Sequence, residues 1–277
     1  MSETIEKFNK HVMQTYGRLP IVLEKGHNDD AVDENGKEYI DFGSGIGTNS
    51  LGYCNDKWAD AVCAQARAIQ HTSNYFYTKV QADFAAKLCE LTGYTDVFFG
   101  NSGAEANECA IKLARKYSFD KYGKGRHTIV TLVNSFHGRT LATLSATGQD
   151  VFHNYFFPFV DGFVNVPAND IDALRKLIAE DKTICAVMFE FVQGEGGVNP
   201  LDKAFVDEIF KLCGENDILT VADEVQTGVG RTGAILTSMR YGVKPDITTL
   251  AKGIAGGVPM GACLADEKCA GVLVKGT

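Results

Sequence analysis

The sequence predicts an α/β fold: a mostly parallel central sheet with helices on both faces, preceded by a small N-terminal α/β segment. Apolar segments of strand length alternate with helical patterns after residue 72, and such alternation is typical of a parallel sheet. The chain has 277 residues, of which 45% are hydrophobic, so it can bury the core of one large domain with smaller appendages.

The N-terminal segment is expected to hold a helix and a hairpin. Residues 3–16 have apolar side chains at helical spacing, and strand-like runs at 21–24 and 38–42 flank a turn at 33–36. We therefore expect residues 1–72 to form part of a small domain and residues 73–277 to form a large cofactor-binding domain.

The larger domain is expected to repeat strand and helix units. The predicted strands are 96–100, 127–133, 184–192, 217–222 and 247–251, and the predicted helices are 80–91, 103–118, 169–180 and 202–214. The last helix shows the spacing well, because Phe205, Ile209 and Leu212 form one stripe. Ligands of such sheets bind outside the carboxyl ends of the strands.

Charge and composition favour a small-molecule partner. The net charge is −8 and no basic cluster stands out, which argues against nucleic acid and against an anionic membrane surface. No apolar run approaches about 18 residues, and the polar, acidic start is unlike a signal peptide, so we expect a cytoplasmic protein. The eight cysteines are scattered without a Cys-x-x-Cys pair, so we expect reduced, mostly buried thiols, no disulfide framework and no metal site.

The end of strand 96–100 has the features of a phosphate site. Ser102 and Glu105 have the spacing of a capping box, which predicts that a helix begins here. The free N–H groups of the first turn attract anions, and Gly103 and Ala104 leave room for a phosphate. An ordinary capped helix without a ligand explains the same pattern.

The apolar run 218–222 ends in adjacent acids. Burial of Asp223 is costly unless a cation meets it, and a protonated pyridine nitrogen would do so through a charge-assisted hydrogen bond. Alternatively Asp223 caps the next turn or binds Mg²⁺ in a phosphate enzyme, although the Gly-x-x-x-x-Gly-Lys-Ser/Thr loop of nucleotide enzymes is absent from the sequence.

Strand 247–251 delivers Lys252 into a glycine-rich turn. Small neighbours leave space for an adduct, and burial would lower the pKa of the amine toward its nucleophilic form. The alternative is an ordinary surface lysine. A phosphate, a ring nitrogen that must stay protonated and an aldehyde that condenses with lysine are the three needs of pyridoxal phosphate.

A further segment, residues 134–140, follows strand 127–133. Phe136 could stack on a flat heteroaromatic ring, and the guanidinium of Arg139 could bind a carboxylate. His137 fits a buried structural histidine equally well, so it is given no catalytic role.

Five ordered motifs carry a family resemblance: residues 101–107 (NSGAEAN), 135–140 (SFHGRT), 190–197 (EFVQGEGG), 222–233 (ADEVQTGVGRTG) and 250–253 (LAKG). Together they resemble the class III, fold-type-I pyridoxal-phosphate aminotransferases. Within that family, residues 15–20, 33–42 and 44–46 are most similar to acetylornithine aminotransferases.

The resemblance implies a role for each matched position. Lys252 would condense with the cofactor aldehyde and act as general base and acid, and Asp223 would pair with the pyridine nitrogen. Arg139 would hold a substrate carboxylate, and Glu195 would be the switch residue that lets one site accept two differently charged substrates. The implied cofactor contacts are Ser102, Gly103, Ala104, Phe136, Asp223, Glu224, Val225, Gln226 and Lys252.

The implied activity is transfer of an amino group from N2-acetylornithine to 2-oxoglutarate by a homodimeric enzyme of arginine biosynthesis. Ornithine, succinylornithine, succinyldiaminopimelate and 4-aminobutyrate aminotransferases are the alternatives within the class, and a noncatalytic fragment that binds pyridoxal phosphate or phosphate is the alternative outside it. The resemblance also leads us to expect that the chain stops before the family's C-terminal domain. That domain would supply an arginine to pair with Glu195, so the chain alone is expected to be a possibly inactive fragment.

Overall fold

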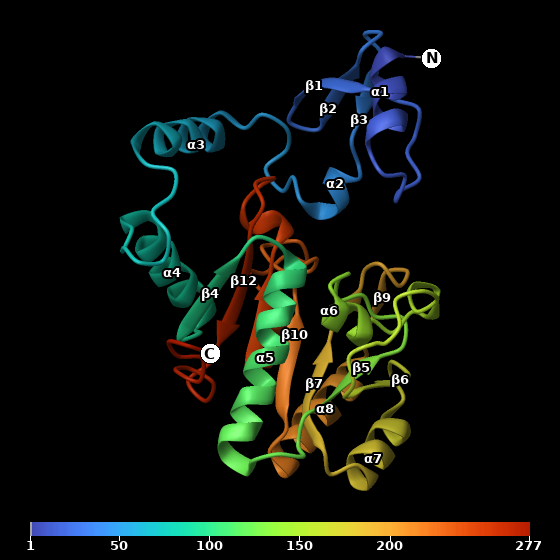
Figure 1. Cartoon of the computed structure of the whole chain (residues 1–277), viewed down its shortest axis with the longest axis vertical. Coiled ribbons are helices and arrows are strands. Elements are labelled where there is room, and N and C mark those ends of the chain that lie inside the picture. The colour runs from blue at the N-terminus through green and yellow to red at the C-terminus, as the bar shows by residue number, and fades with distance from the viewer. Residues whose placement is uncertain (1) are drawn as a thin grey trace. The chain divides into compact units, whose positions relative to one another are not determined.

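The structure, a computed structural model, describes residues 2–277 and divides between Thr72 and Ser73 into two compact units. The first unit has a three-stranded antiparallel sheet in the order β1-β2-β3 (Figure 1). Its elements are α1 (Glu3–His11), β1 (Leu23–His27), β2 (Asp30–Asp33), β3 (Glu38–Ile40), α2 (Ser44–Gly47) and α3 (Asp56–Ala68).

Two predictions for this unit need correction. The predicted helix 3–16 ends at His11, because Val12 is already extended. The predicted turn at 33–36 joins β3 to β2 and not to the run at 21–24, and the Asp33 carboxylate accepts the backbone N–H groups of Asn35 and Lys37 at 2.9 and 3.0 Å. The short, acid-ended β2 gave no strand signal.

The second unit contains a seven-stranded sheet in the order β4-β12-β11-β10-β7-β5-β6. β12 pairs antiparallel with β11 and with β4, and the other four pairs are parallel, so the predicted α/β fold with a mostly parallel sheet is confirmed. Its strands are β4 (Asp96–Gly100), β5 (Thr128–Leu132), β6 (Phe163–Val166), β7 (Ile184–Phe189), β10 (Leu219–Asp223), β11 (Ile247–Leu250) and β12 (Gly261–Ala265), and a small ribbon pairs β8 (Val192–Gln193) with β9 (Asn199–Pro200).

The helices of this unit include the four that the apolar spacing predicts, and two further α-helices and two short 3-10 turns connect them. They are α4 (Lys79–Thr92), α5 (Gly103–Tyr122), α6 (Leu141–Ala146), η1 (Asp150–Phe152), α7 (Ile171–Glu180), α8 (Lys203–Asn216), α9 (Thr237–Tyr241) and η2 (Lys252–Ile254). The predicted strand 184–192 is wrong in its second half, because β7 ends at Phe189 and the chain turns at Glu190.

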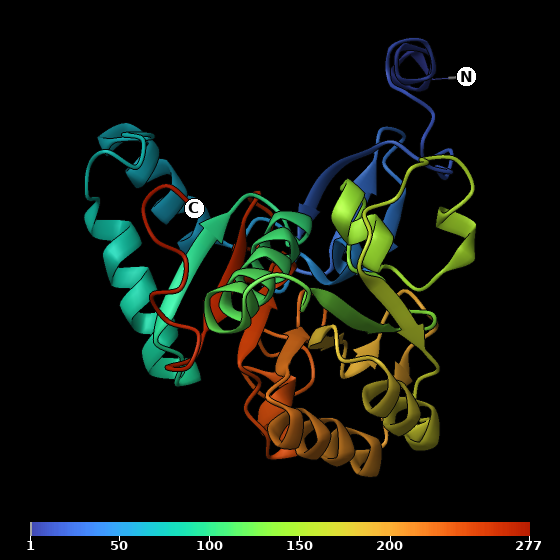
Figure 2. The same cartoon turned by 60° about the horizontal axis from the view of Figure 1, so that its bottom comes forward.

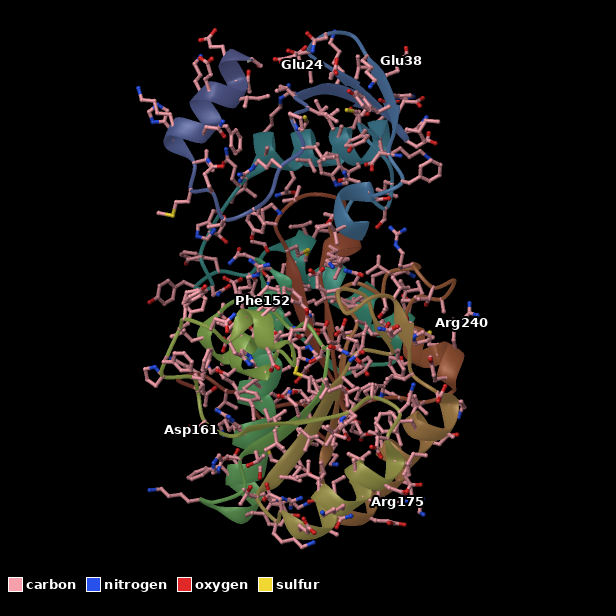
Figure 3. The ribbon with its side chains drawn as sticks, turned by 90° about the vertical axis from the view of Figure 1, so that its right-hand side faces the viewer. Glu24, Glu38, Phe152, Asp161, Arg175 and Arg240 are labelled. Atoms are coloured by element: carbon pink, nitrogen blue, oxygen red, sulfur yellow. The ribbon has the colours of Figure 1, made fainter. Side chains whose placement is uncertain are left out.

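Helices cover both faces of the sheet, as Figure 2 shows with α5 on one side and α7 and α8 on the other. The side chains of β7 alternate accordingly: Ala186 and Met188 pack with α5, whereas Val187 and Phe189 pack with α7 and α8. Arg175 of α7, labelled at the surface in Figure 3, pairs with Glu208 of α8 at 2.8 Å. The sheet is therefore held in a three-layer arrangement.

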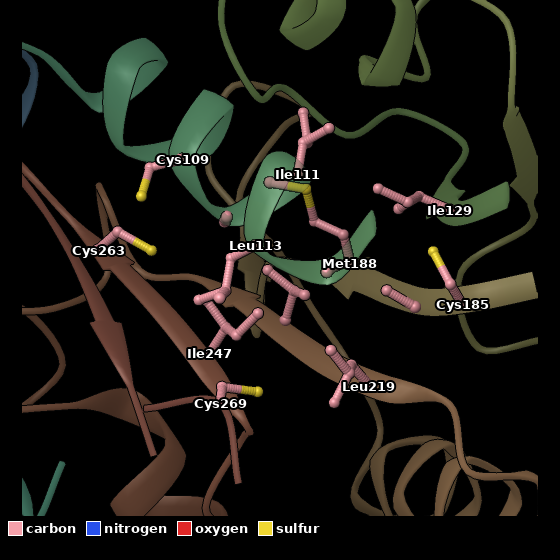
Figure 4. Close-up of a cluster of buried hydrophobic side chains, with 14 of the residues drawn as sticks. Cys109, Ile111, Leu113, Ile129, Cys185, Met188, Leu219, Ile247, Cys263 and Cys269 are labelled. Carbon is pink, nitrogen blue, oxygen red and sulfur yellow. The ribbon is translucent and has the colours of Figure 1, made fainter. Parts of the chain in front are cut away.

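The cysteines are free thiols, and five of the eight are buried, so the expectation of mostly buried thiols is confirmed. Four of the buried cysteines, Cys109, Cys185, Cys263 and Cys269, belong to the core between α5 and the sheet (Figure 4). Within residues 2–277, no helix combines the length and the apolar character needed to cross a membrane.

Candidate active site

The loops that carry the predicted segments meet at the carboxyl edge of the parallel strands. Close approaches at two glycines show how tightly they pack. A Cβ at Gly103, after β4, would lie 2.8 Å from Val225 Cγ1, after β10, and a Cβ at Gly194, after β8, would lie 1.8 Å from Gln226 Oε1. Since neither glycine could carry a side chain without displacing a neighbour, three loops converge on one place.

The start of α5 has the predicted cap with a difference. Ser102 Oγ accepts the N–H of Glu105 at 3.1 Å, but the Glu105 carboxylate accepts the N–H of Asn101 and not that of Ser102. The capping box is thus shifted by one residue. In the described chain the N–H groups of Gly103 and Ala104 have no hydrogen-bond partner, and two such groups at a helix N-terminus fit a phosphate.

Asp223 ends β10 and is only 4% exposed. Its Oδ2 accepts hydrogen bonds from His137 Nδ1 and Asn107 Nδ2, both at 2.8 Å, and its Oδ1 accepts the N–H of Val225 at 3.0 Å. A carboxylate has about four acceptor positions, so these three bonds leave one for a further donor. The carboxylate therefore fits the protonated ring nitrogen that the sequence analysis places here.

The side chain in contact with Asp223 that can carry a positive charge is His137. Burial lowers the pKa of His137, but the hydrogen bond and charge of Asp223, with the charge of Glu190, outweigh it and raise the pKa above its ordinary value. Glu190 is itself buried and accepts the N–H groups of Phe136 at 2.9 Å and Gly194 at 3.3 Å. Burial, opposed by the charge of His137, raises the pKa of Glu190 to about 7.

Lys252 follows β11 and begins η2, with a left-handed backbone (φ = 50°) that is unusual for a residue with a side chain. Burial lowers the pKa of its amine, while the charges of Asp223 and Glu190 act in the opposite direction. Within residues 2–277 the amine makes no ion pair. These conditions favour the neutral, nucleophilic amine.

Arg139 is held at the edge of the site by aromatic rings. Its guanidinium lies 4.8 Å from the ring centre of Phe152 and 5.9 Å from that of Phe136, and the two rings meet edge to face. Phe152, labelled in Figure 3, belongs to η1. The half-buried Phe136 lies three residues before the exposed Arg139, so one loop presents both a flat apolar surface and a cation.

Two other predicted residues differ in their surroundings. Glu224 is fully buried, and its oxygens accept the backbone N–H groups of Thr237 and of Ser238, the latter at 2.9 Å. This carboxylate is therefore engaged at the N-terminus of α9. Glu195 is exposed on the loop after β8, and its charge acts on Lys252.

The structure adds residues to which the sequence analysis gave no role. Asn107, buried on α5, donates to Asp223 and to the His137 carbonyl, and its Oδ1 accepts the hydroxyl of Thr249 at 2.7 Å. Glu190 and His137 complete this network. The sequence signal for them was a polar side chain inside an otherwise small or apolar run, as in Phe189-Glu190-Phe191.

The whole of this region matches one known family. The model of the family described as Aminotransferase class-III matches residues 12–277. The chain belongs to the class-III aminotransferase family. One relative, the acetylornithine aminotransferase of Haemophilus ducreyi, is 52% identical to this chain over 266 residues. The matched region covers 96% of this chain and 67% of the relative. The succinylornithine transaminase of Citrobacter koseri is 45% identical over 277 residues, covering 100% of this chain and 68% of that protein.

Solved structures of aminotransferases share this fold. The ornithine aminotransferase of Toxoplasma gondii superposes with a TM-score of 0.94 at 33% identity, over 99% of this chain and 65% of that one. The acetylornithine aminotransferase of Elizabethkingia anophelis gives a TM-score of 0.86 at 32% identity, over 99% and 66% of the two chains. A second T. gondii structure is described as having partial occupancy of PLP at its active site. The chain thus spans about two thirds of the length of the proteins it matches.

Proposed function

We propose that the protein is a pyridoxal-phosphate-dependent aminotransferase and that residues 73–277 form its cofactor-binding domain. The observation that carries this proposal is the meeting of a buried, hydrogen-bonded acid, Asp223, with a half-buried, nucleophilic amine, Lys252, beside the free N–H groups of α5. When bound, pyridoxal phosphate supplies an aldehyde that condenses with amines and a protonated ring that withdraws electrons from the substrate carbon.

The chain's own residues have separate tasks in this proposal. The N–H groups of Gly103 and Ala104 bind the phosphate, the ring of Phe136 stacks on the flat face, and Asp223 holds the ring nitrogen protonated. Lys252 would take a proton from the substrate carbon that carries the reacting amine, which in an N2-acylated ornithine is C5, and would deliver it to the cofactor carbon, for which a lowered pKa is suited.

Arg139 and Glu195 are proposed for substrate recognition. The guanidinium of Arg139 is exposed and positioned by Phe152, where it can bind a substrate carboxylate through two N–H groups. The negative charge of the exposed Glu195 would attract a substrate with a positive amine. The same charge would repel the second carboxylate of a dicarboxylate substrate, so a cation would have to pair with Glu195 before such a substrate binds.

For substrates we propose N-acetylornithine as amino donor and 2-oxoglutarate as acceptor, in a step of arginine biosynthesis. The relatives named acetylornithine aminotransferase, at 45–52% identity, support this choice. Succinylornithine is the second candidate donor, because a succinylornithine transaminase matches this chain over all 277 residues. Both donors present the same amino acid with a different acyl group.

The cofactor site is tested by mass spectrometry. The 277-residue chain is incubated with pyridoxal phosphate, reduced with borohydride and digested, with Lys252→Ala as the test variant and Lys203→Ala, an exposed lysine, as the matched control. We expect a pyridoxyl group on Lys252 that is lost only in the Lys252→Ala variant. An adduct spread over surface lysines would contradict the proposal.

Substrate choice is tested by measuring the rate at which each amino donor is consumed with 2-oxoglutarate. Acetylornithine, succinylornithine, ornithine and 4-aminobutyrate are compared on this chain and on a chimera completed with the C-terminal third of the Haemophilus ducreyi relative. We expect the acylated donors to react fastest. A faster reaction with ornithine or 4-aminobutyrate would move the assignment to another class-III activity.

A homodimer and a cytoplasmic location belong to the same proposal. Support for the dimer comes from aromatic side chains of the second unit that are more than half exposed, Tyr75, Phe76, Tyr77, Tyr155 and Phe157. Sedimentation velocity of the chain and of Phe76→Ser tests the dimer, since a monomer in both samples would contradict it. Cell fractionation tests the location.

A further inference from the structure

Two cysteines with more than half of the chain between them lie together where α5 packs on β12. Cys109 of α5 and Cys263 of β12 are 7% and 2% exposed, and both belong to the core between α5 and the sheet. Figure 4 shows the side chain of Cys109 pointing from the helix toward that of Cys263 on the strand. Both residues also line one small cavity. The two thiols therefore form a pair across two elements of the fold.

The two sulfurs differ in acidity because one donates a hydrogen bond to the other. The thiol of Cys263 donates to the Cys109 sulfur and lowers the pKa of Cys109 against the effect of burial, and the charge of Lys112 acts in the same direction. The same hydrogen bond, together with burial, raises the pKa of Cys263. Burial also raises the pKa of the other three buried cysteines, which are Cys185, Cys213 and Cys269. Of these five thiols, Cys109 most readily supplies the thiolate, which is the form that reacts with oxidants.

The cavity beside the pair gives a small oxidant a place to bind. Its volume is about 240 Å³, and its lining includes the exposed residues Asp96, Phe98 and Gly271, so it reaches the surface of the protein. A water molecule takes up about 30 Å³ in the liquid, so the cavity has room for hydrogen peroxide beside the two sulfurs. Cys269 lines the same cavity and is the third thiol near the pair.

We propose that Cys109 and Cys263 form an oxidation site that a small hydroperoxide converts into a disulfide and that a thiol reductant restores. The Cys109 thiolate attacks one peroxide oxygen, the O–O bond breaks, and the second oxygen takes up a proton and leaves as water. The Cys263 sulfur then attacks the sulfenic acid on Cys109. The S–S bond forms, the S–O bond breaks, and the hydroxide leaves as water with the proton of Cys263. Together the two thiols lose two electrons and two protons, and hydrogen peroxide is reduced to two molecules of water.

The disulfide would join the two elements that form the proposed phosphate site. α5 carries the N–H groups of Gly103 and Ala104 at its start, and β12 begins at Gly261, where a Cβ would lie 2.1 Å from the carbonyl oxygen of Ser102. An S–S bond of about 2 Å is much shorter than the contact between two separate sulfurs, so it draws α5 toward β12 only two residues from this close contact. Since the backbones already touch there, the pull displaces Ser102 and the N–H groups after it. We therefore expect the oxidised chain to bind pyridoxal phosphate more weakly. This effect rests on the proposed function, whereas the disulfide itself does not.

The first test maps the disulfide in the 277-residue chain. The reduced chain is treated with hydrogen peroxide, its remaining thiols are alkylated in urea, and it is digested without reductant for mass spectrometry. We expect a cross-link between Cys109 and Cys263 that a dithiol reductant removes. No cross-link, or one that joins either residue to a different cysteine, would overturn the proposal, and this outcome needs no variant to fold.

Variants test the order of the two attacks. Cys263→Ala lacks the second sulfur, so the sulfenic acid on Cys109 should persist and be trapped by a 1,3-diketone reagent. Cys109→Ala should give no trapped sulfenic acid on Cys263. Cys269→Ala, which changes the third thiol of the cavity, is the matched control and should form the cross-link as the unchanged chain does. Trapping on Cys263 but not on Cys109 would overturn the assignment of Cys109 as the attacking sulfur.

The effect on the cofactor is measured separately, by titrating the oxidised and the reduced chain with pyridoxal phosphate and following the visible absorption of the bound cofactor. We expect the oxidised chain to bind about 10-fold more weakly or worse, as the loss of one hydrogen bond to a charged group would give, and reduction to restore the affinity. Cys109→Ala, treated with the same peroxide, should keep its affinity. Equal affinities of the oxidised and reduced chains would overturn the effect on the phosphate site. If neither form bound pyridoxal phosphate, this effect would fail together with the proposed function, while the mapped disulfide still stood.

Discussion

The first residue of β12 fixes the position of the proposed phosphate site, and Gly261→Ala tests that relation. A Cβ at Gly261 would lie 2.1 Å from the Ser102 carbonyl oxygen and 2.7 Å from its carbon, whereas Cβ atoms essentially never approach within 3.0 Å. The backbone of Ser102 would have to move by about 1 Å, the difference between 3.0 and 2.1 Å, or β12 would have to shift between its two neighbours.

The cost can be given an order of magnitude from these contacts. Overpacking against backbone destabilises proteins by about 1–3 kcal/mol, so we expect the free energy of unfolding to fall by that amount. Ser102 is the N-cap of α5, and its displacement moves the N–H groups of Gly103 and Ala104. Losing one hydrogen bond to a charged group costs about 1.5–3 kcal/mol, which is about 10- to 100-fold in the affinity for pyridoxal phosphate.

The assay measures both effects on the same samples, by urea unfolding and by fluorescence titration with pyridoxal phosphate. Gly214→Ala is the matched control, because a Cβ at Gly214 on α8 meets nothing within 4 Å. Alanine in a helix is favoured over glycine by about 0.5–1 kcal/mol, so this variant should be slightly stabilised and bind normally. A Gly261→Ala chain with unchanged stability and unchanged affinity would refute the reasoning.

Three further outcomes follow from the hydrogen bonds and pKa values of the site. Asn107→Ala removes two donors and an acceptor from buried partners and should lower the free energy of unfolding by about 2–3 kcal/mol in urea. Burial raises the pKa of Glu190 to about 7 in the folded chain, against an ordinary 4.5, so the unfolded chain loses this proton at a lower pH. The free energy of unfolding should therefore fall as pH rises from about 4.5 to 7, by at most about 1.4 kcal/mol for each unit of pKa difference. Glu190→Gln should remove this pH dependence, as measured by unfolding at a series of pH values. Glu224→Ala leaves two N–H groups of α9 unsatisfied and should cost about 1–3 kcal/mol, while the reducible adduct on Lys252 still forms.

The sequence predicts those elements of the sheet that carry a strong hydrophobic pattern. β4 has the predicted bounds, and β5, β10 and β11 agree within two residues. β12 was missed because Gly261-Ala-Cys-Leu-Ala is short and made mostly of small residues, which favour a strand only when neighbours on both sides pair with it. Strand identity here is thus a result of tertiary packing.

The sequence predicted where the charged side chains of the site lie, but not which residues form hydrogen bonds with them. Charged residues at the ends of apolar strands are conspicuous, because burying them is costly, and this singled out Asp223 and Lys252. The bond between Asp223 and Asn107 joins residues 116 positions apart. Nothing in the local pattern of either segment determines that bond, since it depends on how α5 lies across the sheet.

His137 is a second residue whose hydrogen-bond partner the sequence did not predict. The sequence was compatible with a buried structural histidine and gave it no catalytic role, and the structure buries it against Asp223. Its Nδ1 is hydrogen-bonded like that of a structural residue, yet its Nε2 is buried without a partner and two acids act on its charge. A histidine that served only to fill the core would be cheaper to bury as an apolar side chain, because the unpaired nitrogen is costly. What keeps a histidine at this position is its hydrogen bond to Asp223, a residue 86 positions away, and no local pattern of the sequence indicates that partner.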